Sequence, residues 1–201
     1  MFYASALIRY FDDHNELPHI SKYHRESYKE HCMLVIGAMA ERTTDRTMLI
    51  AACLHDVAKP RTQALNKIGE PCFYGHDEVT DDDLAPFLSA DDECYAYVKA
   101  LLFCHMVPYK VENAKDYDKA LRKECRKALR KAGIEELEDN EEFISNVLLL
   151  HECDDAGSIR RDEDLVGIDE LVKSAETIVC GLQWEIKSLW ELLCNSQVSH
   201  F

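Results

Sequence analysis

The chain has 201 residues, of which 47% are apolar and 30% charged, a composition typical of a soluble globular protein with a sizeable core. Its formal net charge of -15 argues against a protein that tracks a nucleic-acid backbone, because such proteins concentrate positive charge. Seven glycines and five prolines are too few for the frequent turns of a β-sandwich.

The nine cysteines do not indicate a disulfide framework, since their number is odd and none belongs to a Cys-x-x-Cys pair. Most lie in apolar helical stretches, where free cysteine behaves as a small hydrophobic residue, so we expect a reducing cytoplasm. The first residues lack the basic region and apolar run of a signal peptide. Nowhere does an apolar run reach the roughly 18 residues that a membrane span requires, and no membrane association is expected.

Apolar residues recur with helical spacing along most of the chain, which predicts an all-α protein. In the first half, helices are expected at 4–13, at 26–41 and from a cap at Thr44 or Asp45 to Asp56. Pro60 is expected to stop the third helix, because proline lacks a backbone donor and clashes with the preceding turn. In the second half, helices are expected at 77–88 with an interruption at Pro86, and at 92–105, 117–132, 141–154 and 168–194.

Three segments allow more than one interpretation. The stretch 61–75 has no periodicity and is predicted to be a loop, with a short hairpin around 66–69. The basic helix at 117–132 is either an RNA-binding patch or a solvated, salt-bridged face, and the acidic residues around it favour the second. The apolar stripe of the final helix serves either core packing or a homodimer interface.

The adjacent pair His55-Asp56 is the sharpest local signal in the sequence. It ends an apolar run at 48–54 and is followed directly by Val57-Ala58-Lys59-Pro60. A helix end that presents an imidazole, a carboxylate and a cation together is suited to a metal ion and a phosphate group. Because the dipeptide occurs by chance in many proteins, the interpretation depends on what else the chain provides.

Further histidines and an acid occupy apolar helical segments. His31 precedes the apolar run at 32–36, and His105 ends the run at 100–104. A buried imidazole at either position costs free energy unless it is hydrogen-bonded or binds a metal, and each of these histidines is by itself either a satisfied core residue or a ligand. Asp154 closes the apolar segment 147–153, and its neighbour Asp155 is the alternative ligand or a solvated helix end.

Taken together, these residues resemble the signature of the HD superfamily of metal-dependent phosphohydrolases, which is a histidine, then His-Asp, then a distant Asp. The match is His31, His55-Asp56 and Asp154. The closest similarity is to the HD region of bacterial CCA-adding tRNA nucleotidyltransferases and their free-standing relatives. It is carried by Tyr23-His24 with His31 seven positions on, by Leu-His-Asp-Val-Ala-Lys-Pro-Arg-Thr at 54–62 and by Phe-Tyr-Gly-His-Asp at 73–77.

The resemblance implies an HD-type helical bundle within a single domain over 1–201. It covers about 20–160, and a helical extension at about 168–196 lies outside it. No nucleotidyltransferase region precedes Tyr23 in this sequence, so tRNA tailing is not expected. We prefer Asp154 to Asp155 as the final ligand because it follows the small residue Cys153, as the family's aspartate usually follows alanine.

The resemblance also assigns metal and substrate roles. His76 and His105 occupy the places of the two extra histidines in HD proteins with two metals, where Asp56 bridges; alternatively, His76 contacts substrate or caps a helix, and one metal is bound. One or two ions of Mn, Fe, Mg, Ni or Zn would lower the pKa of a bound water, and the resulting hydroxide would attack phosphorus in line. Lys59 and Arg61 are expected to hold phosphoryl oxygens, and His24 to contact the leaving group or the ligands. The alternatives are a solvated helix end whose cations complement the helix dipole for Lys59 and Arg61, and a surface histidine for His24.

These features predict an enzyme that hydrolyses phosphate esters of a phosphorylated small molecule, a nucleotide or an RNA end. The catalytic residues would be Asp56 and Lys59. The competing hypothesis is a regulatory module that keeps the fold and the metal and senses a nucleotide without turnover. Such a module should have lost a ligand or the adjacent cation, and this chain retains the whole set. An accessory domain that binds extended RNA is disfavoured by the acidic charge.

Overall fold

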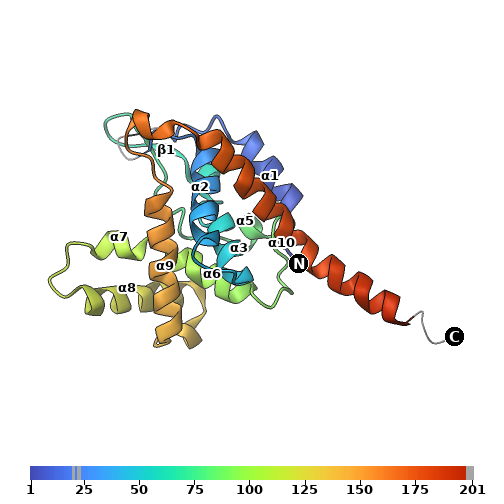
Figure 1. Cartoon of the computed structure of the whole chain (residues 1–201). Helices are drawn as coiled ribbons and strands as arrows, with labels where there is room; N and C mark the ends of the chain where they lie inside the picture. Colours follow the sequence, from blue (N-terminus) through green and yellow to red (C-terminus); the bar gives the residue numbers. More distant parts are fainter. Residues whose placement is uncertain (20, 22–23, 198–201) are drawn as a thin grey trace.

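The structure is a computed structural model that describes residues 1–19, 21 and 24–197, with the backbone alone at 184–197. This part of the chain is mainly helical, and its one sheet is a two-stranded hairpin, which confirms the predicted all-α class (Figure 1). Tyr23 lies outside the described residues. Among the helices that are described, none combines the length and apolar character needed to cross a membrane.

Four helices form the centre of the molecule and carry or precede most of the candidate ligands. Helix α2 packs against α3, α9 and α10, and α3 packs against α6 and α9. Because neighbours cover α2 on several sides, its apolar residues face in several directions instead of forming one stripe, as expected of a buried helix. These central helices are α2 (Tyr28–Ala40), α3 (Arg46–Leu54), α6 (Tyr95–Cys104) and α9 (Glu141–Ala156).

Side-chain caps fix where three of these central helices begin. Ser27 accepts a hydrogen bond from the backbone nitrogen of Glu30, whose side chain accepts one from the backbone nitrogen of Ser27, and α2 therefore starts with a complete capping box. Asp45 caps α3, and Asn140 caps α9. Since a cap sets the first residue of a helix, it also sets which side chains face the core one or more turns later.

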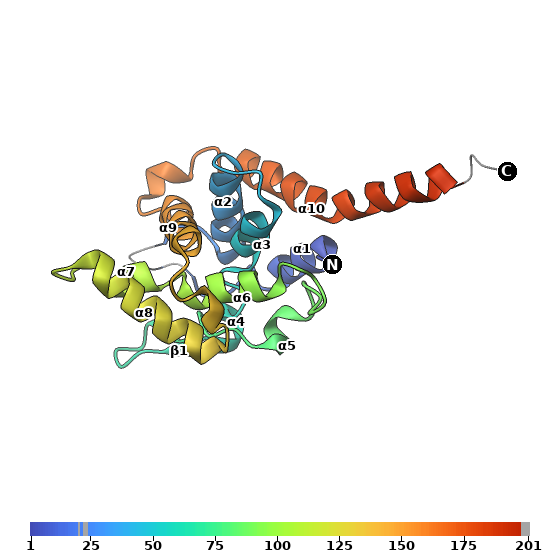
Figure 2. The same ribbon diagram turned by 90° about the horizontal axis from the view of Figure 1, so that it is seen from below.

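The remaining elements surround this centre. Helices α7 and α8 lie together on the side of the molecule away from α10 (Figures 1 and 2). The second half of α10 extends away from the body, and the proposed dimer interface on this helix remains a prediction. The surrounding elements are α1 (Ala4–Asp13), α4 (Lys59–Thr62), β1 (Ala64–Leu65), β2 (Pro71–Cys72), α5 (Asp81–Leu84), α7 (Val107–Val111), α8 (Tyr117–Ala132), η1 (Glu135–Leu137), η2 (Asp162–Leu165) and α10 (Ile168–Gln197).

Several predicted boundaries differ from the structure, and proline chemistry accounts for the one at Pro60. Pro60 does not simply end a helix: it lies in the first turn of α4, where its missing donor would have no partner in any case. The same rule places Pro108 in the first turn of α7, a helix that the periodicity did not predict. The helix expected at 77–88 is reduced to α5, which begins after a capping box at Thr80. The hairpin expected around 66–69 is present as β1 and β2.

Most basic residues of α8 are paired with acids. Arg122 donates two hydrogen bonds to Glu141, at 2.7 and 2.8 Å, and Arg130 pairs with Glu138 in the same two-pronged way. These pairs are those expected of a salt-bridged surface, because an arginine fork already engaged by a carboxylate is not free for a phosphate.

Gly157 lies where the end of α9 comes closest to α2, next to the candidate ligand His31. Its carbonyl oxygen lies 3.1 Å from His31 Nδ1. A Cβ atom added at Gly157 would lie 2.5 Å from Val35 Cγ2 and 2.9 Å from the backbone nitrogen of Val35. The end of α9 can therefore approach α2 this closely only without a side chain at this position.

We expect Gly157→Ala to destabilise the protein by about 1–3 kcal/mol, because the added methyl group forces α9 away from α2. Urea unfolding measures the effect. Gly37→Ala is the matched control, since a Cβ there meets nothing within 4 Å and alanine is favoured over glycine inside α2 by about 0.5–1 kcal/mol. Equal stability of the two variants would contradict this account of the packing.

Candidate metal centre

Six side chains from distant parts of the chain meet in one buried cluster, which we call the metal centre. Every predicted metal ligand is among them, and each comes from the beginning or end of a helix or from a loop. His31 belongs to the first turns of α2, His55 and Asp56 follow α3, His105 follows α6, and Asp154 lies in the last turn of α9. The sixth, His76, follows the hairpin.

One half of the centre consists of His31, His55 and Asp154. The two imidazole Nε2 atoms are 3.2 Å apart, and Asp154 Oδ1 lies 3.2 Å from that of His31 and 3.7 Å from that of His55. Asp56 Oδ2 approaches the same two nitrogens, at 3.4 and 3.3 Å. These three side chains present ligand atoms close enough together to hold a metal ion.

The other half consists of His76, His105 and again Asp56. The Nε2 atoms of the two histidines are 3.2 Å apart, and Asp56 Oδ1 lies 3.3 Å from that of His76. Asp56 therefore offers one carboxylate oxygen to each histidine pair. This is the arrangement that a carboxylate bridging two metal ions would need, and the group Asp56, His76 and His105 can hold a metal ion by itself.

All four histidines are oriented by the same contact. Each Nδ1 faces a backbone carbonyl oxygen: that of Gly157 for His31, Ala52 for His55, Phe73 for His76 and Leu102 for His105, at 3.1, 2.9, 2.8 and 2.6 Å. An Nδ1–H that donates to a carbonyl fixes the tautomer and leaves the Nε2 lone pair unprotonated. The four Nε2 lone pairs and the two carboxylates then face one another. These groups repel one another unless a cation or a proton lies between them.

Asp56 Oδ2 supports a cation at this position. It is buried, and although Lys59 Nζ is 2.6 Å away, the atom has no partner with hydrogen-bond geometry in the described structure. Burial acts to raise the pKa of Asp56, but the charge of Lys59 and contacts with His55 and His31 outweigh it and hold the pKa well below its usual value. The carboxylate is therefore ionised, and its open lone pair fits a divalent metal.

Two tyrosines fix the turn that carries Asp56. The hydroxyl of Tyr28, on α2, donates to the backbone oxygen of Asp56 at 3.0 Å, and that of Tyr10, on α1, donates to the oxygen of Val57 at 2.7 Å. The backbone oxygen of Asp56 also accepts a hydrogen bond from the backbone nitrogen of Lys59, at 2.9 Å, so two donors hold it in place. The position of the bridging carboxylate depends on α1 and α2 as well as on α3.

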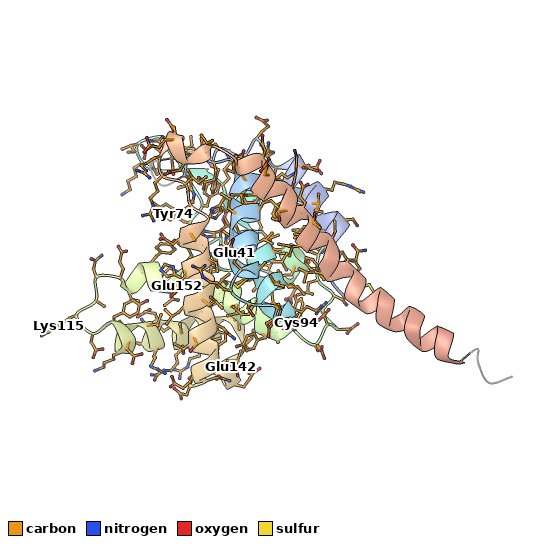
Figure 3. The ribbon with its side chains drawn as sticks, in the orientation of Figure 1. Glu41, Tyr74, Cys94, Lys115, Glu142 and Glu152 are labelled. Carbon is orange, nitrogen blue, oxygen red and sulfur yellow. The ribbon has the colours of Figure 1, made fainter. Side chains whose placement is uncertain are left out.

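The described side chains of the centre are almost entirely buried. His31, His55 and His105 are fully buried, whereas His76 and Asp154 keep 9% and 7% of their surface exposed. Glu152, two residues before Asp154 on α9, is exposed at the surface (Figure 3). Asp155 is also exposed and pairs with Arg160, so the structure brings Asp154 and not Asp155 to the cluster.

The predicted substrate-binding residues do not all accompany the ligands. Lys59 is buried beside Asp56. Arg61 is directed elsewhere: its guanidinium donates two hydrogen bonds to Asp83, at 2.8 and 2.9 Å, and one to the backbone of Glu78. The expectation that Arg61 accompanies Lys59 at the centre is therefore wrong, because its planar fork matches the carboxylate of Asp83.

The side of the centre next to His31 contains three residues of one segment. His24 Nδ1 lies 2.6 Å from Glu26 Oε1, and its ring centroid is 4.9 Å from that of His31. His19 and Glu26 are buried there too, and neither was predicted to take part in the site. The sequence around His19 and Glu26 has no helical periodicity. The only signal that could have indicated them is that a glutamate follows His24 by two positions.

Comparison with known protein families, with curated proteins and with solved structures finds no match for this chain. Membership of the HD superfamily therefore stays an expectation from the residues quoted above. The geometry of the six side chains is independent of that resemblance, since it follows from the fold alone.

We expect Asp154→Asn to weaken binding of a divalent ion such as Mn²⁺ by about 100-fold or more, because an amide oxygen replaces a charged ligand. Asp155→Asn, one residue away and exposed, should change the affinity by less than about twofold. Isothermal titration calorimetry of both variants measures the difference. Equal losses of affinity in the two variants would contradict the role of Asp154 as a ligand and would favour a solvated helix end.

Metal binding should weaken as the pH falls. Burial acts to lower the pKa of His31, but contacts with Asp154 and Asp56 outweigh it and raise the pKa well above its ordinary value. A proton therefore competes with the metal for His31 up to a pH above the usual histidine range, and binding must release it. We expect the apparent affinity for Mn²⁺ to rise between about pH 5.5 and about pH 8.5. An affinity constant over that interval would contradict the proton competition.

Proposed function

We propose that the protein is a metal-dependent phosphohydrolase with an HD-type helical bundle. The observation that carries the proposal is the convergence of four imidazole Nε2 atoms on the carboxylates of Asp56 and Asp154, with every Nδ1 facing a backbone carbonyl. Such oriented nitrogen and oxygen ligands are typical of first-row transition-metal sites that perform hydrolysis.

The position of Lys59 supports hydrolysis of a phosphate ester over simple metal storage. Its ammonium group is buried and lies within 2.6 Å of the candidate bridging carboxylate. A buried cation at the edge of a metal site can donate to a non-bridging phosphoryl oxygen and stabilise the charge that accumulates there in the transition state. A site for metal storage has no need of this cation.

Within this proposal each residue has a defined task. When bound, one or two divalent ions would lower the pKa of a water molecule and neutralise charge on the phosphoryl group. Asp56 would hold both halves of the centre together through its two oxygens, and Lys59 would orient the phosphoryl group. The buried histidines would exclude water from the inner side, and substrate would approach from the side of His76 and Asp154, which keep some exposed surface.

The substrate belongs to the class of phosphorylated small molecules, nucleotides and RNA ends. Extended nucleic acid is disfavoured, since the net charge is -15 and the arginines of α8 are engaged by carboxylates. The segments that flank the open side, around 61–75 and 110–117, would determine which of these substrates is accepted.

The test combines metal content with turnover. The purified protein is loaded with Mn²⁺, Mg²⁺, Ni²⁺ or Zn²⁺, and hydrolysis of bis(4-nitrophenyl) phosphate and 4-nitrophenyl phosphate is followed. Turnover with two ions per chain supports a dinuclear centre; turnover with one returns His76 and His105 to contacts with substrate. Bound metal without turnover of these esters or of nucleotides would favour a nucleotide-sensing module, and no bound metal would overturn the proposal.

We expect His55→Ala or Asp56→Ala to abolish metal binding and hydrolysis together. Removing a hydrogen-bond partner behind a ligand costs about 10–100-fold in metal affinity or activity, and removing the ligand itself should cost more. Helix content, measured by circular dichroism, should stay largely intact. His14→Ala is the control, because His14 lies on α1's C-terminal end outside the centre. Turnover retained by either centre variant would contradict the mechanism.

A further inference from the structure

A residue outside every predicted site lies in direct contact with Lys59. His19 Nε2 is 3.0 Å from Lys59 Nζ, and both side chains are buried, with 2% and 7% of their surface exposed. His19 belongs to the segment after α1, 40 positions before Lys59 in the sequence. Burial of an imidazole against an ammonium group needs a reason, because two donors placed there would repel each other.

The surroundings of His19 determine which atom it presents to Lys59. Its Nδ1 faces the backbone oxygen of Glu26 at 3.4 Å. Its ring is enclosed by those of His24, His31 and Tyr28, with centroids at 4.1, 5.2 and 6.1 Å. Burial, followed by the charge of Lys59, lowers the pKa of His19 to about 2, so the ring is neutral. With its proton on Nδ1, the Nε2 lone pair accepts from the ammonium group.

Lys59 and a metal ion would both bind the same oxygen atom, Asp56 Oδ2. Lys59 Nζ approaches Asp56 Oδ2 at 2.6 Å, and this same oxygen faces His31 and His55 Nε2 at 3.4 and 3.3 Å. A divalent ion held by these two histidines would take the lone pair that Lys59 now faces. If Asp56 were its only acceptor, Lys59 would then be a buried cation without a partner, which is costly.

We propose that His19 is a positioning residue that holds the ammonium group of Lys59 at the edge of the centre and so leaves Asp56 Oδ2 available to a divalent cation. This inference rests on the proposed metal centre. It assigns His19 no contact with the metal or the substrate: its role is to keep Lys59 satisfied and in place when Asp56 turns to the metal.

A double-mutant cycle on metal affinity tests the coupling without any need for turnover. We expect His19→Phe, which keeps a ring and loses the acceptor, to weaken Mn²⁺ binding about tenfold. In a Lys59→Met background the same change should alter the affinity by less than about twofold, because no ammonium group remains to compete for Asp56. His19→Gln retains an acceptor and should stay within about threefold of the unaltered protein.

His14→Phe is the matched control, since this histidine contacts Tyr10 and lies away from the centre; its affinity for Mn²⁺ should be unchanged. A loss in His19→Phe that persists in the Lys59→Met background would show that His19 acts by packing or as a ligand beside His31 and Asp56, and would overturn the proposal. No loss in His19→Phe would overturn it as well. If the unaltered protein binds no Mn²⁺, the metal centre itself fails, which is a distinguishable result.

A measurement on the unaltered protein covers the case in which His19→Phe does not fold. Nitrogen-15 NMR of labelled histidine distinguishes the two neutral tautomers of His19. We expect the proton on Nδ1 and an Nε2 shift typical of a hydrogen-bond acceptor, unchanged across the neutral pH range. A proton on Nε2 would prevent this atom from accepting a hydrogen bond from Lys59 and would contradict the inference.

Discussion

The architecture of the site depends on one carboxylate. Asp56 lies between two histidine pairs, offers a different oxygen to each, and is buried where an ionised group persists only in the company of cations. The elements around it can be understood as means of holding that carboxylate in place: α3 ends just before it, and Tyr28 and Tyr10 bind the backbone oxygens of its turn.

Backbone carbonyl groups perform the work that carboxylates often perform behind metal-binding histidines. Three of the four carbonyls that face an Nδ1 atom belong to the residue three positions earlier, so each of these histidines is oriented by its own local turn. His31 is the exception, because its Nδ1 faces the oxygen of Gly157 across the α2–α9 contact and also lies 3.4 Å from Glu26 Oε1. Packing of these two helices therefore controls one ligand directly, whereas the other three are largely set by local structure.

Charged side chains pair differently at the surface and in the interior. The outer acids and bases of α8 pair at the surface, where such pairs contribute little to stability. Lys59 is different, because a buried ammonium group must have acceptors. Among the described residues it lies against Asp56 and His19, which belong to the centre or adjoin it. A protein that is acidic overall thus buries a cation beside the carboxylate of Asp56.

The sequence by itself determined the helical class and most helix positions, because helical periodicity and N-caps are local signals. The six candidate ligands were predicted from their resemblance to a known signature, with Asp154 and Asp155 both open. The sequence did not reveal that Arg61 pairs with Asp83, nor that His19 and Glu26 join the centre, because those contacts link segments with no periodic pattern. Only the tertiary structure decided between Asp154 and Asp155 and gave Asp56 its place between two histidine pairs, since adjacent residues on a helix point about 100° apart and packing alone selects the inward one.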